Sequence, residues 1–304
     1  MNRPIQGVLP VFQTPFHDNF SIDFATLAHE IEWLYDQGAD GIVMGMVSET
    51  LRLSGEEREA LAEAACRLGS ARGLVVISAG AESTHTAVHY ARHAEAVGAD
   101  AVMVIPPIAV AVGEDDLRGY YEAILNAIQI PVIVQDASGY VGRPMSIAMQ
   151  AALYHDYGDQ VMFKPEAAPI GPRLSALRDA TAGRAPVFEG TGGIALVDSF
   201  RRGVVGAMPG ADLIDGLVAL WRALRAGDEA RIYRLSLPIS ALIAVQHSLD
   251  AFLAVEKYLL VKRGIFKNTL ARGPVGYHLD AETRAEVDRL YEQVQAALRE
   301  TATA

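Results

Sequence analysis

The 304-residue sequence contains a single cysteine, Cys66. One thiol cannot form an intramolecular disulfide, and it excludes a metal site built from several cysteines. Such scarcity fits a reducing compartment, so we expect a cytoplasmic protein. The first residues, Met1 to Pro4, lack the apolar stretch of a signal peptide, and no apolar run is long enough for a transmembrane helix. We therefore expect no membrane contact.

Basic residues are outnumbered by acidic ones, 26 against 37, and the formal net charge is −11. An acidic surface disfavours nucleic acid and anionic membranes as partners, although it leaves room for a small anionic substrate. The histidines His85, His89 and His93 share one predicted helix face, but they match no metal-ligand pattern. We expect a solvated or interface face there, and no metal site.

Short apolar runs alternate with longer amphipathic stretches throughout the first two thirds of the chain. Helical patterns such as Phe24–Gln37, Gly55–Leu68 and His85–Val97 separate eight continuously apolar runs, which is typical of buried parallel strands. This alternation predicts an α/β fold, a (β/α)8 TIM barrel. A doubly wound sheet is the competitor, but no Gly-x-Gly-x-x-Gly motif follows the first run, so a nicotinamide enzyme is a distant alternative. The predicted strands are Gly7–Gln13, Gly41–Met44, Leu74–Ser78, Ala101–Ile105, Pro131–Gln135, Gln160–Lys164, Pro186–Glu189 and Val204–Met208.

The remainder of the chain, from about Asp212, has only helical patterns. Ile232–Phe266 predicts one or two helices, and Ala281–Glu300 predicts a polar amphipathic helix. We therefore divide the chain into a barrel carrying the active site, residues 1–222, and a C-terminal helical domain, residues 223–304. No low-complexity linker separates them, so the appendage should dock tightly.

Lys164 is the most informative candidate for chemistry. Three apolar residues lead into it, and Pro165 and Glu166 follow. In a barrel the chemistry lies at the carboxyl ends of the strands, and Lys164 is the only lysine at any predicted strand end. Most lysines are solvated, but an amine held at a pocket is partly desolvated, which favours its neutral, nucleophilic form. Such an amine forms a Schiff base with a ketone.

Several motifs together resemble the class I Schiff-base lyases of the dihydrodipicolinate synthase and N-acetylneuraminate lyase superfamily. They are the opening from Val8 to Phe16, the loop from Gly45 to Thr50 after the second strand, and the lysine that ends the sixth strand. The resemblance covers nearly the whole chain, includes the helical tail, and implies tetramers built as dimers of dimers. We accordingly expect a homo-oligomer, a dimer or a tetramer.

The chain departs from the synthase pattern at positions that matter for its reaction. Gln135 stands where synthases and aldolases of the family carry a tyrosine, and Met46 and Val47 replace the paired threonines. The arginine that follows strand five has no clear match, and Gly139 or Tyr140 occupies its region. The resemblance therefore argues against dihydrodipicolinate synthesis.

The Val-Gln-Asp-Ala stretch and the Lys-x-Glu arrangement resemble the dehydratases of 2-keto-3-deoxy sugar acids, particularly the L-2-keto-3-deoxyarabonate type. In that branch a glutamate two residues past the lysine handles protons, and Glu166 matches it. Two residues along an extended chain also place Glu166 on the same side as Lys164. The alternative is that Glu166 only pairs with a cation such as Arg143 or Arg173.

The substrate carboxylate is expected at loop 45–50, because backbone N–H groups in such turns bind anions. Met46, Val47, Ser48 and Thr50 are the candidate binding residues there, and Ser48 or Thr50 could add a hydroxyl donor. Glu49 should point away and brace the loop. Gln135 and Asp136 could bind substrate hydroxyls, or Asp136 could cap the following turn. Gly190 and Thr191 should let the distal end of the substrate approach the backbone.

Three functions remain open from sequence. The first is a dehydratase of a 2-keto-3-deoxy sugar acid that forms an imine on Lys164 and needs no other cofactor. The second is a pyruvate-dependent aldolase on the same scaffold. The third is a non-catalytic 2-oxo acid-binding or regulatory protein, suggested by the missing tyrosine and threonines.

Overall fold

The protein, represented by a computed structural model, is described for residues 4–302. Its strands all pair in parallel and are mostly short. They are β1 (Gly7–Val8), β2 (Gly41–Val43), β3 (Leu74–Ser78), β4 (Ala101–Val104), β5 (Val132–Asp136), β6 (Val161–Pro165), β7 (Phe188–Glu189) and β8 (Gly206–Ala207).

The strands close into a barrel. One sheet runs β2-β3-β4-β5-β6 and the other β7-β8-β1. A bridge between Phe163 and Val187 joins β6 to β7, and one between Val11 and Val43 joins the first strand segment to β2. The predicted (β/α)8 barrel is confirmed.

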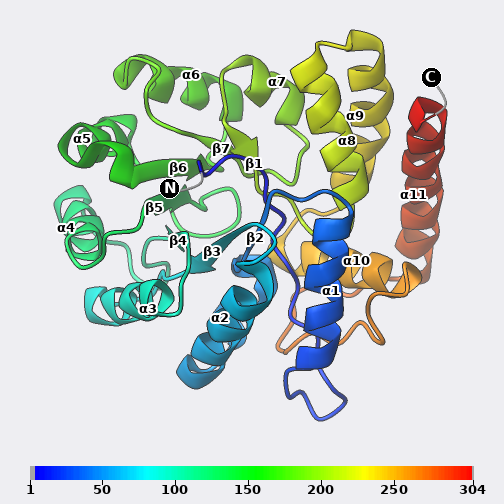
Figure 1. Ribbon diagram of the computed structural model, residues 1–304, viewed down its shortest axis with the longest axis horizontal. Helices are drawn as coiled ribbons and strands as arrows, with labels where there is room; N and C mark the ends of the chain where they lie inside the picture. The colour runs from blue at the N-terminus through cyan, green and yellow to red at the C-terminus, as the bar shows by residue number, and fades with distance from the viewer. Residues whose placement is uncertain (1–3, 303–304) are drawn as a thin grey trace.

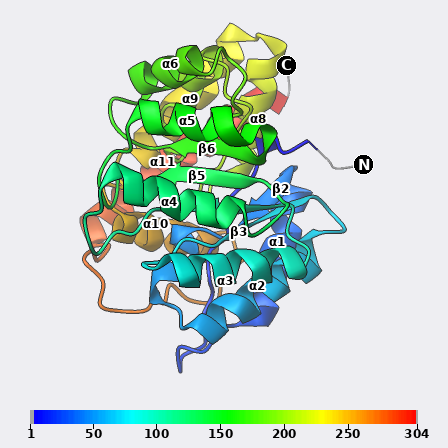
Figure 2. The ribbon, with the colours of Figure 1, turned by 90° about the vertical axis from the view of Figure 1, so that its left-hand side faces the viewer.

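Helices surround the strands in Figure 1, and α3 to α6 lie side by side on the face shown in Figure 2. Single turns of 3₁₀ helix occur at Met46–Ser48, Thr50–Arg52 and Gly158–Gln160. The barrel helices are α1 (Phe24–Asp36), α2 (Gly55–Gly69), α3 (Thr84–Ala96), α4 (Glu114–Leu125), α5 (Ile147–Tyr157), α6 (Ile170–Ala180), α7 (Leu196–Arg201) and α8 (Ile214–Ala226).

The largest boundary difference lies in the first strand. The predicted run Gly7–Gln13 contains only two residues of regular strand, Gly7 and Val8. Pro10 has no N–H to donate to a ladder, and the chain beyond it makes single bridges from Val11 to Val43 and Gly210. The other predicted strands agree to within one or two residues at each end, and Leu74–Ser78 agrees fully.

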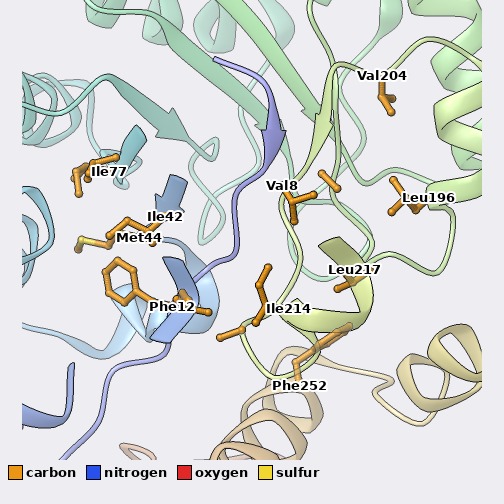
Figure 3. Packing of buried hydrophobic residues seen from close by; sticks show 14 of the residues in the cluster. Val8, Phe12, Ile42, Met44, Ile77, Leu196, Val204, Ile214, Leu217 and Phe252 are labelled. Carbon is orange, nitrogen blue, oxygen red and sulfur yellow. The ribbon is translucent and has the colours of Figure 1, made fainter. Parts of the chain in front are cut away.

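The core has two layers because alternate residues of a strand face opposite sides. Met162 packs inside the barrel with residues such as Leu9, Val76 and Ile133. Val161 and Phe163, the neighbours of Met162, pack outside, between strands and helices. Figure 3 shows part of this outer cluster, which includes residues from α8 and Phe252.

The C-terminal segment forms α9 (Glu229–Ile243), α10 (Leu249–Lys262) and α11 (Ala281–Ala302). Helix α11 packs against α9 and α8, as Figure 1 shows at its right edge. The predicted boundary at residue 222 falls inside α8, and the division into two domains stays a prediction. Among residues 4–302, no helix combines the length and apolarity needed to cross a membrane.

Candidate active site

Strand β6 places Lys164 and Glu166 at the top of the barrel interior, on the same side as Met162. The Lys164 Nζ lies 2.9 Å from Glu166 Oε1. The two residues are only 4% and 3% exposed, so solvent screens this ion pair weakly. The structure thus brings together the two residues predicted to carry the chemistry.

Gln135, on β5, completes the arrangement around Glu166. It lies opposite Lys164 in the strand register, and its Nε2 donates to Glu166 Oε2 at 3.0 Å. Burial raises the pKa of Glu166, against the opposing effects of the Lys164 charge and the Gln135 hydrogen bond. A carboxyl with a raised pKa can accept and return a proton near neutral pH.

These three side chains line a small cavity at the carboxyl end of the barrel strands. Lys164 is the one cation among the lining residues, which are Val11, Met46, Val47, Gln135, Tyr140, Lys164, Glu166, Gly190, Gly192, Met208, Pro209, Gly210, Leu249, Phe252 and Glu256.

The loop after β2 contributes backbone rather than hydroxyl groups. Ser48 Oγ donates to the carbonyl of Phe12, and Thr50 Oγ1 donates to that of Gly45 at 3.2 Å. Both hydroxyl protons are therefore used, and neither residue lines the cavity. Met46 and Val47 do line it, and their N–H groups have no recorded partner among the described residues. Such orphan donors at the start of a helical turn are suited to a carboxylate.

Glu49 braces this loop, as predicted. It adopts a left-handed conformation with φ of 58°. Its Oε1 accepts from the fully buried Lys257 of α10, and its Oε2 accepts from the backbone of Arg272 at 2.8 Å. The loop that offers the N–H groups is thus fixed by the C-terminal segment.

Asp136 and Thr191 have structural partners instead of facing the cavity. Asp136 accepts from the backbone of Ser138 and Met145 and pairs with Arg173 at 3.3 Å. It therefore caps the turn, one of the two roles considered from sequence. Arg173, considered from sequence as a cation that could pair with Glu166, pairs with Asp136 instead.

Thr191 holds the neighbouring carboxyl of Glu189. Its N–H donates to Glu189 Oε1 at 2.7 Å, and its hydroxyl donates to the same oxygen. Glu189 is buried with its Oε2 unpaired, and burial raises its pKa. Gly190 lines the cavity directly: a Cβ there would lie 2.8 Å from Glu166 Cγ and 2.9 Å from Lys164 Cε.

Sequence reasoning did not identify Glu256, Phe252, Leu249 or Tyr140 as site residues. The first three come from α10 and follow i, i+3, i+7 spacing, so they share one helix face. A glutamate on an otherwise apolar face was the available signal. The fourth, Tyr140, follows β5 and packs edge-on against Phe252, with ring centroids 5.6 Å apart.

No group of three or more His, Cys, Asp or Glu side chains within residues 4–302 has a geometry that could hold a metal ion. Among the lining residues, Lys164 supplies the amine and Glu166 the carboxyl next to it.

Comparison with known proteins identifies the family of this chain. Residues 4–294 match the model of the dihydrodipicolinate synthetase family. A 4-hydroxy-tetrahydrodipicolinate synthase from Bartonella bacilliformis is 28% identical over 88% of this chain and 90% of its own length. The L-2-keto-3-deoxyarabonate dehydratase of Azospirillum brasilense is 27% identical over 93% of this chain and 92% of its own.

Among solved structures, a dihydrodipicolinate synthase from Rhodopseudomonas palustris superposes with a TM-score of 0.86 at 27% identity. The superposition covers 95% of this chain and 97% of that one. Sequence and fold agree over almost the entire length, and this chain therefore belongs to the dihydrodipicolinate synthetase family.

Proposed function

We propose that this protein is a Schiff-base lyase that dehydrates a 2-keto-3-deoxy sugar acid. The observation that carries the proposal is the buried pair of Lys164 and Glu166, with Gln135 hydrogen-bonded to the carboxyl. The likeness to an L-2-keto-3-deoxyarabonate dehydratase supports it, as does Gln135 in place of the synthase tyrosine. The coarser conclusion, membership of a family of lyases, does not depend on this choice.

The first step needs a neutral amine. In a buried ion pair, transfer of a proton from Lys164 to Glu166 replaces two desolvated charges by two neutral groups. The free amine attacks the C2 carbonyl of the substrate, and an amine proton passes to the carbonyl oxygen to give a carbinolamine. Glu166 returns its proton to that hydroxyl, which leaves as water, so that a cationic iminium and the Glu166 carboxylate remain. Meanwhile the N–H groups of Met46 and Val47 would bind the C1 carboxylate.

The second step removes a proton from C3 and expels the C4 hydroxyl, and Glu166 carries the proton between them. The iminium withdraws electrons from C3, and Glu166 takes the C3 proton, which gives a neutral enamine. The positive charge that lowered the pKa of Glu166 has now disappeared, so burial favours the protonated form of this carboxyl. It then gives the proton to the C4 hydroxyl, which leaves as water. Hydrolysis of the resulting conjugated iminium releases the dehydrated 2-oxo acid and restores Lys164.

Borohydride trapping tests the imine. The native protein incubated with pyruvate and borohydride should show a stable mass adduct, and Lys164→Ala should show none. Glu166→Gln should still form the adduct and lose turnover by roughly 10²- to 10⁴-fold, the range for general acid–base catalysis. Release of pyruvate from a 2-keto-3-deoxy acid would identify an aldolase instead. Absence of an adduct with pyruvate and with longer 2-oxo acids would refute the lyase mechanism.

The remaining features follow the same proposal. The substrate is a small 2-oxo acid, and no cofactor is required beyond the covalent imine. We also propose a cytoplasmic homo-oligomer, either a dimer or a tetramer, supported by the lone cysteine and by the resemblance to the family. Light scattering in solution would measure the oligomeric state.

A further inference from the structure

A wall of the cavity contains a carboxyl group that the proposed mechanism does not use. Glu256 lies on α10, more than ninety residues after Lys164 in sequence, yet both line the same cavity. Glu256 is 1% exposed. Its neighbours on the helix face, Phe252 and Leu249, make this wall apolar apart from the carboxyl group.

The position of the Glu256 carboxyl is tightly constrained. Gln13, which follows the first strand, donates from Nε2 to Glu256 Oε2. The carboxyl also packs directly on the backbone of Gly210 after β8, where a Cβ would overlap it. Two other parts of the chain, at Gln13 and at Gly210, thus hold the Glu256 carboxyl at the cavity.

The surroundings of Glu256 favour its protonated form. Burial raises its pKa well above the usual range, and the negative charges of Asp212 and Glu30 raise it further, against the hydrogen bond from Gln13. Asp212 and Glu30 are themselves buried, with pKa values raised to about 7 and about 8. The cations that act on these two neighbours are engaged elsewhere: Lys257, which acts on Glu30, binds Glu49, and Arg263, which acts on Asp212, binds Asp215. A neutral carboxyl is a hydrogen-bond donor.

Tyr140 supplies a second donor at the same cavity. It packs against Phe252, and its hydroxyl has no recorded hydrogen bond among the described residues. The carboxyls of Glu166, Glu189 and Glu256 are close enough to raise its pKa further, after burial, so the phenol stays neutral. The cavity therefore offers two O–H donors, from Tyr140 and from the protonated form of Glu256, and no arginine among its lining residues.

We propose that Glu256 and Tyr140 form a specificity subsite that selects 2-oxo acids with an uncharged, hydroxylated distal end and rejects those with a second carboxylate. The hydroxyl oxygens of such a substrate would accept hydrogen bonds from both side chains. A distal carboxylate would instead be buried at the apolar α10 wall with no cation there to pair with it, which is unfavourable. The inference rests on the proposed function, because the imine to Lys164 fixes the other end of the substrate.

Competition for the imine tests the subsite without requiring turnover. Pyruvate and borohydride give a trapping signal, and three longer acids compete with it: a 2-keto-3-deoxy sugar acid, 2-oxopentanoate, and 2-oxoglutarate. The hydroxylated acid should compete at concentrations at least ten-fold lower than the other two. Equal competition by 2-oxoglutarate would overturn the subsite.

Substitutions then assign the selectivity to residues. Glu256→Leu should reduce the preference for the hydroxylated acid over pyruvate by roughly 10- to 100-fold, the scale of one or two lost hydrogen bonds to a bound ligand. Glu256→Gln keeps a hydrogen-bond donor and should retain most of the preference for the hydroxylated acid. Tyr140→Phe removes one donor and should lose part of that preference. Tyr258→Phe is the matched control, since Tyr258 also lies on α10 but donates to Asp288 outside the cavity. An unchanged preference in Glu256→Leu would overturn the assignment.

Calorimetry with the same acids separates this inference from the proposed function. Binding that discriminates between the two classes, without any adduct, would overturn the imine mechanism and leave the subsite standing. Adducts that form with the hydroxylated acid and with 2-oxoglutarate at equal affinity would overturn the subsite and leave the imine mechanism standing. No binding of any acid would overturn both.

Discussion

Replacing Gly190 with alanine should disturb the Lys164–Glu166 pair directly, because the added Cβ has no free space. It would lie 2.8 Å from Glu166 Cγ and Oε1 and 2.9 Å from Lys164 Cε, whereas ordinary contacts begin at 3.4 Å. Both side chains are buried and held by neighbours, Glu166 by Gln135 in particular. Relief of the overlap therefore requires the reacting groups to shift, by roughly half an ångström to one ångström in a close-packed site.

The expected effect on catalysis is large and the effect on folding is moderate. A misplacement of about 1 Å at reacting groups costs on the order of 10²-fold in rate. Overpacking by one methyl group in a core costs about 1–3 kcal/mol of unfolding free energy. We therefore expect Gly190→Ala to fold, to lose about two orders of magnitude in turnover, and to trap pyruvate more slowly.

The assay compares single-turnover trapping by borohydride, followed by intact mass, with urea unfolding of the same samples. Gly119→Ala is the matched control, because Gly119 lies within α4 and a Cβ there would meet no atom within 4 Å. That variant should keep native trapping and gain up to about 1 kcal/mol from helix propensity. Native trapping rates and turnover in Gly190→Ala would refute the close approach of residue 190 to the pair.

Two further predictions concern stability. Burial raises the pKa of Glu30 from 4.5 to about 8, so its neutral form stabilises the fold fully below about pH 4.5 and this stabilisation is lost as the pH rises through 8. Glu30→Gln should therefore lose less unfolding free energy between pH 5 and pH 9 than the native protein, by at most about 5 kcal/mol. Parallel urea titrations of both proteins at the two pH values would check this. An equal loss of unfolding free energy in the two proteins would contradict it. Lys257→Met should cost about 3–5 kcal/mol, because it leaves the carboxylate of Glu49 buried without its cation. Adding Glu49→Gln should restore part of that loss in the same unfolding assay, and a Lys257→Met variant as stable as the native protein would show that the pair is not buried as described.

Much of the fold was predictable because strand and helix signals are local. Continuous apolar runs and the helical periods between them located every strand segment of the barrel. The exception was the first strand, where an apolar run through Pro10 predicts more regular pairing than a residue without an N–H can make. Strand-end position also identified Lys164 and Glu166, since successive residues of β6 alternate between the two sides of the barrel wall.

The rest of the site depends on tertiary contacts that a sequence does not display. Whether Ser48 and Thr50 offer hydroxyls depends on backbone carbonyls that lie near them only after folding, and both are engaged by such carbonyls. Asp136 could equally have capped a turn or bound substrate, and the presence of Arg173 beside it decides for the turn. Residue type and strand position left these alternatives open.

Helix α10 shows most clearly why the C-terminal segment belongs to the site. Its consecutive residues Glu256 and Lys257 are both buried, which is rare for charged residue types. They project in different directions. Glu256 faces the cavity, and Lys257 binds Glu49 and the carbonyl of Thr14, which fixes the loop that presents Met46 and Val47. A shift of α10 would therefore move one wall of the cavity and the proposed carboxylate donors together. Under the proposed mechanism, the helix would set both the length of substrate that fits and the position of the end that reacts.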